Sequence, residues 1–221
     1  MKNIIFIAPP AAGKGTQSKL VSAEYNIPHI STGDLLRDEI NSGSELGNRI
    51  IDDMNSGLLV SNDIIVRLLR NRISEVDCNN GYILDGFPRN VEQAKIYQDL
   101  LNELRIDVGL VIYMDIDKNL AMSRSLSRVI CSSCGASYNN NVPELRPKLD
   151  GICDKCGHAL KVREDDNQDT INTRYDTYIT ETQPLIDYYK EQGILKDVKI
   201  EEQDSTQDIF AKIKYIIDNN K

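Results

Sequence analysis

The chain has 221 residues, of which 40% are hydrophobic, and its 26 basic and 34 acidic residues leave a formal net charge of −8. The hydrophobic share is enough for one sizeable core, so we expect one main domain with insertions. The acidic balance argues against a protein that binds nucleic acid through a general basic field, so any bound phosphate has to be held by local groups. No apolar run has the length of a membrane span or the flanks of a signal peptide, which predicts a cytoplasmic protein with reduced cysteines.

Short apolar runs alternate with helix-length segments, which indicates an α/β fold with a mostly parallel sheet. Strands are predicted over residues 3–7, 28–31, 82–84, 108–114 and 194–200. Helices are predicted over Lys14–Tyr25 and residues 117–129, and twice near the end of the chain, where apolar side chains recur at helical spacing. The recurring residues are Ile171, Tyr175, Tyr178, Thr182, Leu185, Ile186 and Tyr189 in one helix, and Ile209, Ile213, Ile216 and Ile217 in the other.

Two stretches interrupt this alternation. Residues 32–72 contain several short helical patterns separated by glycines, and no strand is predicted among them. Residues 130–162 are rich in turn residues and too poor in apolar ones to form a hydrophobic core of their own. We therefore expect a single domain whose core comprises residues 1–31, 73–129 and 163–221, with the two stretches inserted into it.

Four cysteines in the second insertion form two C-x2-C pairs, Cys131 with Cys134 and Cys153 with Cys156, and 18 residues separate the pairs. This spacing fits a tetrahedral zinc site, and a reducing compartment favours a metal over disulfides. Four thiolates leave no open coordination position, which predicts a structural ion that supplies the stability missing from the insertion. His158 could replace Cys156 as a ligand.

The first predicted strand leads into the loop Ala8-Pro9-Pro10-Ala11-Ala12-Gly13-Lys14-Gly15-Thr16 and then into a helix. This arrangement directs backbone N–H groups and the positive end of the helix to one point, where Lys14 can reach phosphate oxygens and Thr16 can face Mg²⁺. Ala8 and Ala11 occupy positions where the motif often has glycine, and each would cost about 1–2 kcal/mol if its backbone needed a positive φ. Alone, the motif leaves open a coincidental strand, turn and helix.

Two further motifs lie where strands end. Asp85-Gly86-Phe87-Pro88-Arg89 offers a carboxylate that can hold Mg²⁺ through water and an arginine that can bind phosphate. The alternative for Asp85 is that it only caps the next helix. Ile30-Ser31-Thr32-Gly33-Asp34-Leu35-Leu36-Arg37 likewise sets a hydroxyl and an arginine at the start of a helix.

Taken in order, GKGT, STGDLLR, DGFPR with a glutamine four residues later, and REDD resemble the motifs of adenylate kinases, in particular the type with a zinc-binding lid. The resemblance extends over essentially the whole chain. It implies a P-loop three-layer α/β fold with a central parallel five-stranded sheet, a helical segment at residues 32–72 that binds a nucleoside monophosphate, and a small zinc-containing lid at residues 130–162. It also implies reversible, Mg²⁺-dependent phosphoryl transfer from ATP to AMP, giving two ADP, by a cytoplasmic monomer that acts in adenine nucleotide homeostasis and has no nucleic-acid or membrane partner.

The resemblance also assigns residues to the site. For AMP it assigns Thr32, Arg37, Leu58, Leu59, Val60, Gly86, Arg89, Gln93, Arg163 and Arg174. For ATP it assigns Ala11, Ala12, Gly13, Lys14, Gly15, Thr16, Arg124 and Arg128, and the catalytic groups would be Lys14, Asp85, Arg89, Arg124, Arg128, Arg163 and Arg174. The family often has a second arginine where this chain has Val129. It usually has a glycine-containing turn that contacts the ATP adenine, where this chain has residues 201–205, so the sequence does not place that contact.

Arg124 and Arg128 lie four residues apart on the helix predicted over residues 117–129, so they are expected to share one face, although a solvated basic face would give the same pattern. No pair of nucleophile and base is required, because the attacking phosphate oxygen is already ionised. Positioning and charge stabilisation by Lys14, the arginines and Mg²⁺ would therefore be sufficient.

Other functions remain open at the level of sequence. A sister kinase for UMP, CMP or GMP would share the phosphate loop and the DGFPR-like strand, although the long cysteine-containing insertion and Gln93 favour AMP. A non-catalytic, nucleotide-responsive zinc module would be consistent with Ala8, Ala11 and Val129. A nucleic-acid-binding zinc ribbon is disfavoured because the insertion has no dense basic stripe.

Overall fold

The computed structural model describes residues 3–56, 60–162 and 167–220, without the side chains of residues 53 and 55. Its core is a five-stranded sheet in which every neighbouring pair is parallel. In spatial order the strands are β2 (His29–Ser31), β3 (Ile83–Asp85), β1 (Ile4–Ile7), β4 (Leu110–Ile116) and β8 (Leu195–Ile200). The predicted central parallel sheet is confirmed, and the strand bounds differ from the predicted ones by no more than about two residues.

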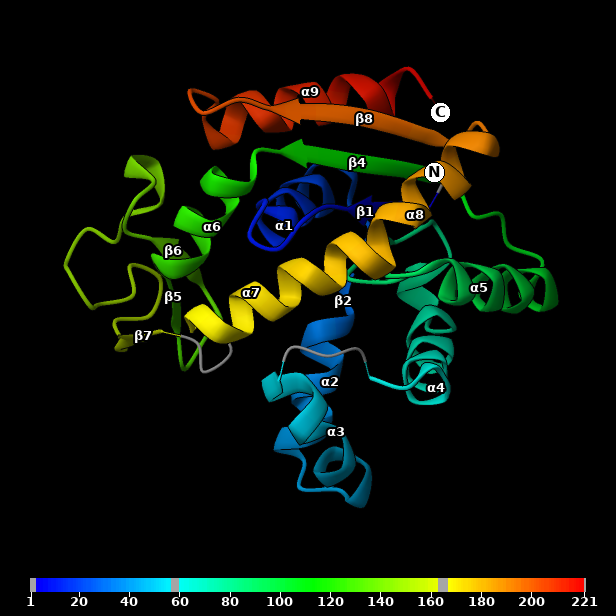
Figure 1. Cartoon of the computed structure of the whole chain (residues 1–221), viewed down its shortest axis with the longest axis horizontal. Coiled ribbons are helices and arrows are strands. Elements are labelled where there is room, and N and C mark those ends of the chain that lie inside the picture. The colour runs from blue at the N-terminus through cyan, green and yellow to red at the C-terminus, as the bar shows by residue number, and fades with distance from the viewer. Residues whose placement is uncertain (1–2, 57–59, 163–166, 221) are drawn as a thin grey trace.

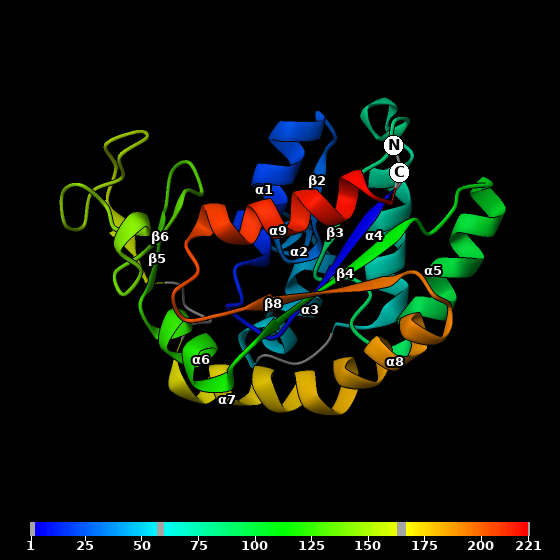
Figure 2. The same cartoon turned by 90° about the horizontal axis from the view of Figure 1, so that it is seen from above.

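Helices cover both faces of this sheet (Figures 1 and 2). α1 (Lys14–Tyr25) and α9 (Thr206–Asp218) lie on one face, and α5 (Val91–Leu104) and α8 (Gln183–Glu191) lie on the other. Successive strand residues point to opposite faces, so Ile4 and Phe6 pack towards α1 and α9, whereas Ile5 and Ile7 pack in the other apolar cluster. Burial on both faces explains why β1 is continuously apolar.

The two helical patterns near the end of the chain are also confirmed. The first comprises α7 (Gln168–Thr177), a π-helical turn (Tyr178–Thr182) and α8. All its predicted apolar-face residues are buried except Tyr175, which is half-buried. α9 buries Ile209, Ile213 and Ile217, and it begins with a capping box in which Ser205 and Asp208 satisfy each other's backbone N–H groups.

The first insertion is helical, as predicted. It contains α2 (Thr32–Asn41), α3 (Glu45–Ser56) and α4 (Asn62–Ile73), and the described part of residues 32–72 contains no β-strand. Figure 1 shows α2 and α3 projecting away from the sheet, while α4 lies beside α5. A short 3-10 turn (Val76–Cys78) follows, in which Cys78 is buried. Within the described ranges, no helix is both long and apolar enough to cross a membrane.

The second insertion is a small three-stranded antiparallel sheet in the order β6-β5-β7, set apart from the main sheet in Figure 1. Its strands are β5 (Arg128–Cys131), β6 (Ser137–Asn139) and β7 (Leu160–Lys161). Its buried apolar cluster contains only Cys131, Ala136, Tyr138 and Cys153. This small cluster agrees with the expectation that the insertion has too few apolar residues for a core of its own.

The helix predicted over residues 117–129 is wrong in its last part. α6 (Lys118–Leu126) stops at Leu126, and Arg128 and Val129 belong to β5. The side-chain amide of Asn139, on β6, donates to the Arg124 carbonyl at 2.7 Å, and its oxygen accepts from the Ser127 hydroxyl at 2.8 Å. These long-range bonds satisfy the helix end, so Arg124 and Arg128 do not share a helix face.

Candidate active site

The phosphate loop joins β1 to α1 at the carboxyl edge of the sheet. Gly13 has a φ of 89° and turns the chain into α1, whose first N–H groups therefore face the loop. The Nζ atom of Lys14 donates to the carbonyl oxygens of Ala8 at 3.0 Å and Pro9 at 3.4 Å. The ammonium group is thus held inside the loop, where burial lowers the pKa of Lys14 to about 8 against an opposing effect of Asp85.

The two alanines of this loop differ in backbone conformation. Ala11 has a φ of 59°, in the left-handed region, whereas Ala8 is not among the described non-glycine residues with positive φ and is buried at the end of β1. Of the two alanines, only Ala11 therefore has the strain that a positive φ imposes on a residue with a Cβ atom.

Replacing Ala11 by glycine is expected to raise the free energy of unfolding by about 0.5–1 kcal/mol, because the relief of left-handed strain exceeds the entropy that glycine adds to the unfolded chain. The matched variant Ala8→Gly gains no such relief and should lower it by about 0.5–1 kcal/mol. Denaturant unfolding of both variants measures the difference. Shifts of the same sign and size would contradict this assignment.

Asp85 ends β3 next to the phosphate loop. The strand register pairs Asp85 with Phe6 on one side and Ser31 on the other. A Cβ atom added to Gly15 would lie 3.5 Å from Oδ2 of Asp85, so this carboxylate is close to the start of α1. Nε2 of His29 lies 3.4 Å from the same oxygen, without hydrogen-bond geometry. Burial raises the pKa of Asp85, but His29 and the positive charge of Lys14 outweigh this, and the pKa lies below its ordinary value.

Thr32, Gly86 and Arg89 meet at the ends of β2 and β3. The hydroxyl of Thr32 donates to the Asp85 carbonyl at 3.4 Å, and Nε of Arg89 donates to the Gly86 carbonyl at 2.8 Å. Gly86 has a φ of 86°, and a Cβ atom there would lie 2.9 Å from the Thr32 hydroxyl. Only glycine therefore allows this close approach of a hydroxyl and a guanidinium group.

Arg37 and Gln93 are held near the starts of two separate helices, α2 and α5. The guanidinium of Arg37 lies over Gly33 and forms an ion pair with Asp34 in the first turn of α2. Gln93 is fully buried near the start of α5, where the Asn90 side chain caps the helix by accepting from the Gln93 backbone N–H at 2.8 Å. The two helices thus bring one cation and one buried amide to the same side of the sheet as Arg89.

Three arginines that are distant in sequence lie within electrostatic reach of Lys14. They are Arg89 after β3, Arg128 on β5 and Arg174 on α7, and each lowers the pKa of Lys14. The structure therefore brings these predicted residues together with Asp85. Such a concentration of cations around one buried lysine suits a ligand with several negative charges.

Arg124, in the last turn of α6, is half-buried, and its Nε atom has no hydrogen-bond partner among the described residues. Burial lowers the pKa of Arg124, while Glu144 and Asp204 raise it. Leu58, Leu59 and Arg163 lie outside the described residues. Val60, which was predicted to act together with Leu58 and Leu59, is buried just before α4.

The turn after β8 forms without glycine. The backbone N–H of Glu201 donates to Oδ2 of Asp204 at 2.8 Å, and the Asp204 N–H donates back to the Glu201 carbonyl at 3.1 Å. Lys212 forms an ion pair with the same carboxylate at 2.6 Å. An aspartate side chain thus closes the turn where the sequence has no glycine.

Two contacts near the site were missed by sequence reasoning. Oδ1 of Asn62 accepts from Nε2 of Gln93 at 3.0 Å, and Oε1 of Glu144 accepts from the backbone N–H of Thr206 at 3.0 Å. In each contact the two partners are far apart in the chain, and neither Asn62 nor Glu144 belongs to a motif. The only available signal was that Asn62 lies near the predicted segment ending at Val60.

The four cysteines of the second insertion converge on one point. Their sulfur atoms all lie within 4.8 Å of one another, with 3.4 Å between Cys131 and Cys156 and 3.6 Å between Cys134 and Cys153. Tetrahedral zinc with bonds of about 2.3 Å would need sulfur separations of about 3.8 Å. The donor set therefore fits a zinc ion.

The two C-x2-C pairs of this cluster lie in turns with the same backbone conformation. In each C-x2-C-G turn the glycine has a positive φ and its N–H donates to the carbonyl of the first cysteine, at 3.1 Å from Gly135 to Cys131 and 2.9 Å from Gly157 to Cys153. His158, considered as a substitute ligand, instead places Nδ1 3.1 Å from the Cys156 carbonyl oxygen. Among the described residues, the group that could hold a metal ion consists of the four cysteines.

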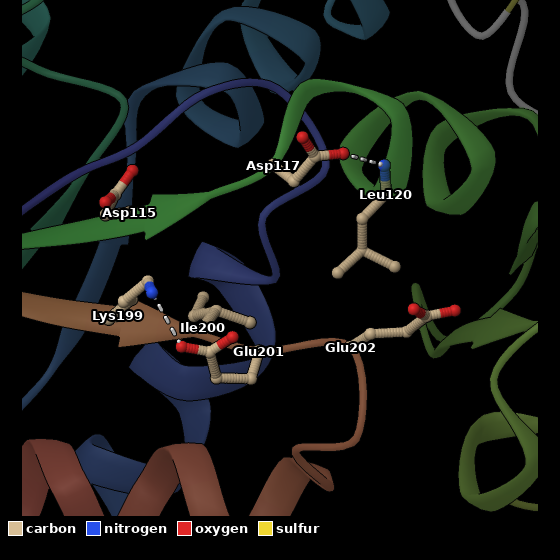
Figure 3. Close-up of a pocket in the computed structure, with 7 residues that line it drawn as sticks. All are labelled: Asp115, Asp117, Leu120, Lys199, Ile200, Glu201 and Glu202. Carbon is tan, nitrogen blue, oxygen red and sulfur yellow. Dashed lines mark hydrogen bonds and ion pairs between the residues drawn. The ribbon is translucent and has the colours of Figure 1, made fainter.

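A pocket of about 320 Å³ lies at the carboxyl ends of β4 and β8, at the same edge of the sheet as the phosphate loop (Figure 3). It is lined by Asp115, Asp117, Leu120, Lys199, Ile200, Glu201 and Glu202. Lys199 pairs with Glu201 at 2.9 Å, and Asp117 accepts from the backbone N–H of Leu120 at the start of α6. Four carboxylates against one lysine would repel phosphate, so this pocket is a poor nucleotide phosphate site.

Lys14 gives a prediction for pH. Its pKa is lowered by burial from 10.5 to about 8, so at pH 9 the free protein holds it mostly neutral, and a bound triphosphate should restore the charge by proton uptake. Calorimetry of inorganic triphosphate binding at pH 9 in two buffers of different ionisation enthalpy should show this uptake, and Lys14→Met should abolish it. Equal binding enthalpies in both buffers would contradict it.

The same shift has a defined effect on stability. Between pH 8 and pH 10.5 the unfolded chain binds more protons at Lys14 than the folded chain does, because its folded pKa is the lower one. The Lys14 contribution to the free energy of unfolding therefore rises with pH across that window.

Comparison with known proteins gives a consistent result. The family model described as adenylate kinase matches residues 6–194. An adenylate kinase of Clostridioides difficile is 46% identical over 196 residues, covering 89% of this chain and 90% of that protein. Adenylate kinases of Archaeoglobus fulgidus and Clostridium acetobutylicum are 43% and 42% identical, each over 97% of this chain and over 95% and 98% of their own lengths. The matched region contains the phosphate loop, both strand-end motifs and the four cysteines.

Proposed function

The chain belongs to the adenylate kinase family, and from this premise we propose that it transfers the terminal phosphoryl group of ATP to AMP, reversibly and with Mg²⁺, giving two ADP. The observation that carries the proposal is the convergence of Lys14, Asp85 and Arg89, with Arg128 and Arg174 nearby, at one edge of the parallel sheet. Ligands of such sheets bind beyond the carboxyl ends of the strands, which is where these groups lie. We take the protein to act as a cytoplasmic monomer.

The ATP side of the site would be the phosphate loop. Backbone N–H groups at the start of α1 and the ammonium of Lys14 would hold the phosphates of ATP, and the hydroxyl of Thr16 would face the metal ion. Lys14 would exchange its bonds to the Ala8 and Pro9 carbonyls for phosphate oxygens. Arg124, whose Nε lacks a hydrogen-bond partner in the described structure, has a donor to offer near the turn after β8.

The AMP side would be formed by the first insertion and the end of β3. The Thr32 hydroxyl and the Arg37 and Arg89 guanidinium groups would bind the AMP phosphate, and Gln93 would hydrogen-bond the adenine. Leu58, Leu59 and Val60 would lie near the adenine, with Gly86 lining the pocket. The two nucleotides would then lie on either side of Asp85.

The residues near the phosphate loop fit Mg²⁺. Asp85 is half-buried with a pKa below its ordinary value, and its Oδ2 faces the start of α1, so it would hold the ion, with the Thr16 hydroxyl beside it. When bound, Mg²⁺ supplies charge neutralisation on the phosphates of ATP. Lys14 and Arg89 would keep the transferring group in line between donor and acceptor, and Arg128, Arg163 and Arg174 would stabilise its negative charge.

The cysteine-containing insertion would act as a lid with a structural zinc ion held by Cys131, Cys134, Cys153 and Cys156. Four thiolates saturate tetrahedral zinc, so the ion would have no open position for water or substrate. β5 joins this insertion to the site, because it carries Arg128 at one end and Cys131 at the other. The folded insertion would thereby hold Arg128 in place and help to exclude water from ATP.

Phosphorus NMR of a reaction with ATP, AMP and Mg²⁺ tests the proposal. We expect two ADP for each ATP consumed, the same equilibrium mixture when starting from ADP, and almost no ATP loss when AMP is omitted. Release of inorganic phosphate at the same rate with or without AMP would indicate hydrolysis and contradict the proposal. Nucleotide binding without any reaction would also contradict it.

A further inference from the structure

We propose that Tyr138 is a positioning residue of the zinc site, whose hydroxyl donates a hydrogen bond to the Cys153 thiolate and so strengthens zinc binding. The inference rests on the proposed function, because it requires the four cysteines to hold zinc. Tyr138 is the middle residue of β6, and Cys153 is the first cysteine of the second C-x2-C pair. The hydroxyl oxygen and the sulfur lie 3.5 Å apart, across 15 positions of sequence.

The four cysteines differ in their access to water. Cys131 and Cys153 are buried, with 2% of each residue exposed, whereas Cys134 and Cys156 are exposed. Four thiolates carry more negative charge than one Zn²⁺ ion neutralises, and a buried sulfur cannot share that charge with water. Protein donors therefore have to stabilise the two buried thiolates.

Backbone N–H groups supply part of this stabilisation at both buried sulfurs. Each sulfur is faced by two N–H groups of its own turn, which belong to Ser133 and Cys134 for the first pair and to Lys155 and Cys156 for the second. The Tyr138 hydroxyl is an additional, side-chain group at Cys153. It comes from a different strand, so it joins the second C-x2-C turn to the small sheet of the insertion.

The direction of the bond from Tyr138 follows from its two partners. A backbone N–H can only donate, so the Asp154 N–H, 2.8 Å from the hydroxyl oxygen, uses a lone pair of that oxygen and leaves its hydrogen for another acceptor. A cysteine that binds a metal is a thiolate without a hydrogen, so Cys153 can then only accept. In the zinc-bound protein the hydroxyl therefore donates to the sulfur.

The hydroxyl is held at this position before any metal binds. Tyr138 is 9% exposed, pairs with Val129 of β5 and belongs to the buried apolar cluster of the insertion. The Asp154 N–H holds the oxygen at the end of the side chain. Little side-chain freedom is therefore lost when the bond to sulfur forms, and the donor contributes to zinc binding.

The test compares the wild-type protein with Tyr138→Phe, which keeps the ring and removes only the hydroxyl. Tyr82→Phe is the matched control, because it removes a buried hydroxyl that bonds to Tyr97 at 2.7 Å, in a core cluster without any of the four cysteines. Competition with a chelator of known zinc affinity gives the zinc dissociation constant. We expect Tyr138→Phe to raise it about 10-fold, the usual effect of removing a group that hydrogen-bonds to a metal ligand, and Tyr82→Phe to leave it unchanged.

Replacing zinc by Co²⁺ separates a bond to sulfur from a general loss of stability. Co²⁺ binds to tetrahedral thiolate sites, and its sulfur-to-metal charge-transfer band reports the energy of the sulfur lone pairs. A donated hydrogen bond lowers that energy, so the band should move to longer wavelength in Tyr138→Phe and stay in place in Tyr82→Phe. A merely structural hydroxyl, including its bond to Asp154, would weaken zinc binding without moving the band.

An unmoved band in Tyr138→Phe would overturn the inference, and so would an unchanged zinc dissociation constant. If Tyr138→Phe does not fold, Tyr138→Met, which also fills the cluster without a hydroxyl, serves for the same comparison. A wild-type protein that binds neither zinc nor Co²⁺ would refute the proposed zinc site itself. The metal content of the wild-type protein therefore distinguishes the two failures.

Discussion

Replacing Lys14 by methionine is expected to lower kcat for phosphoryl transfer from ATP by about 10²–10³-fold, the usual effect of removing one donor aimed at developing charge. Methionine keeps the length of the side chain and removes the ammonium group. That group donates to two carbonyl oxygens of the phosphate loop and lies within electrostatic reach of Asp85. The expected loss is therefore in the chemical step and in ATP binding.

The stability of the Lys14→Met protein, in contrast, should be equal to or higher than that of the wild-type protein. Burial lowers the pKa of Lys14, and Arg89, Arg128 and Arg174 lower it further, so the charge is held there at a cost in stability. The melting temperature of Lys14→Met should stay within a few degrees of the wild-type value or rise. Lys19→Met, exposed on the same helix, is the control and should keep full activity. A Lys14→Met enzyme with more than about a tenth of the wild-type kcat would refute the assigned role.

Replacing Cys131 and Cys134 by serine is expected to remove zinc from the protein and to lower its melting temperature by about 5–10 °C, which corresponds to about 2–3 kcal/mol for a chain of this size. The insertion has a buried apolar cluster of only four residues, two of which are cysteines of the metal site. Without the metal this cluster can hold β5, β6 and β7 together, and Arg128 in place, only at low temperature. Lys14, Asp85 and Arg89 lie outside the insertion, so turnover at low temperature should largely persist.

Two controls separate loss of the metal from the effect of substitution. Cys78→Ser removes the cysteine that lies outside the cluster and should keep one zinc per chain. Ser133→Ala changes an exposed residue between the first two cysteines and should leave the melting temperature unchanged. Unchanged stability in the metal-free double variant would refute a structural role for zinc.

The central sheet and the convergence of the site could be predicted from sequence because both depend on local patterns. Short apolar runs identify strands that are buried on both faces, and the helix over Lys14–Tyr25 has the predicted bounds. Once the strands are parallel, their carboxyl ends share one edge, so motifs that follow β1, β2 and β3 have to meet. Lys14, Thr32 and Asp85 are brought together in this way.

Features that depend on distant partners could not be predicted. α6 ends at Leu126 because the side chain of Asn139, on a strand of the second insertion, bonds to the end of the helix, and nothing within the helix signals this. The contact between Asn62 and Gln93 likewise joins two helices that sequence patterns treat separately. The left-handed conformation of Ala11 is a third case, because the sequence raised the question of strain and only the backbone angle answers it.

The central claim is that this site transfers a phosphoryl group from ATP to AMP. It is tested most directly by measuring steady-state transfer from ATP with Mg²⁺ to AMP, UMP, CMP and GMP in parallel, with zinc determined on the same preparation. We predict a strong preference for AMP and one zinc ion per chain. A preference for UMP, CMP or GMP, or nucleotide binding without turnover, would contradict the claim.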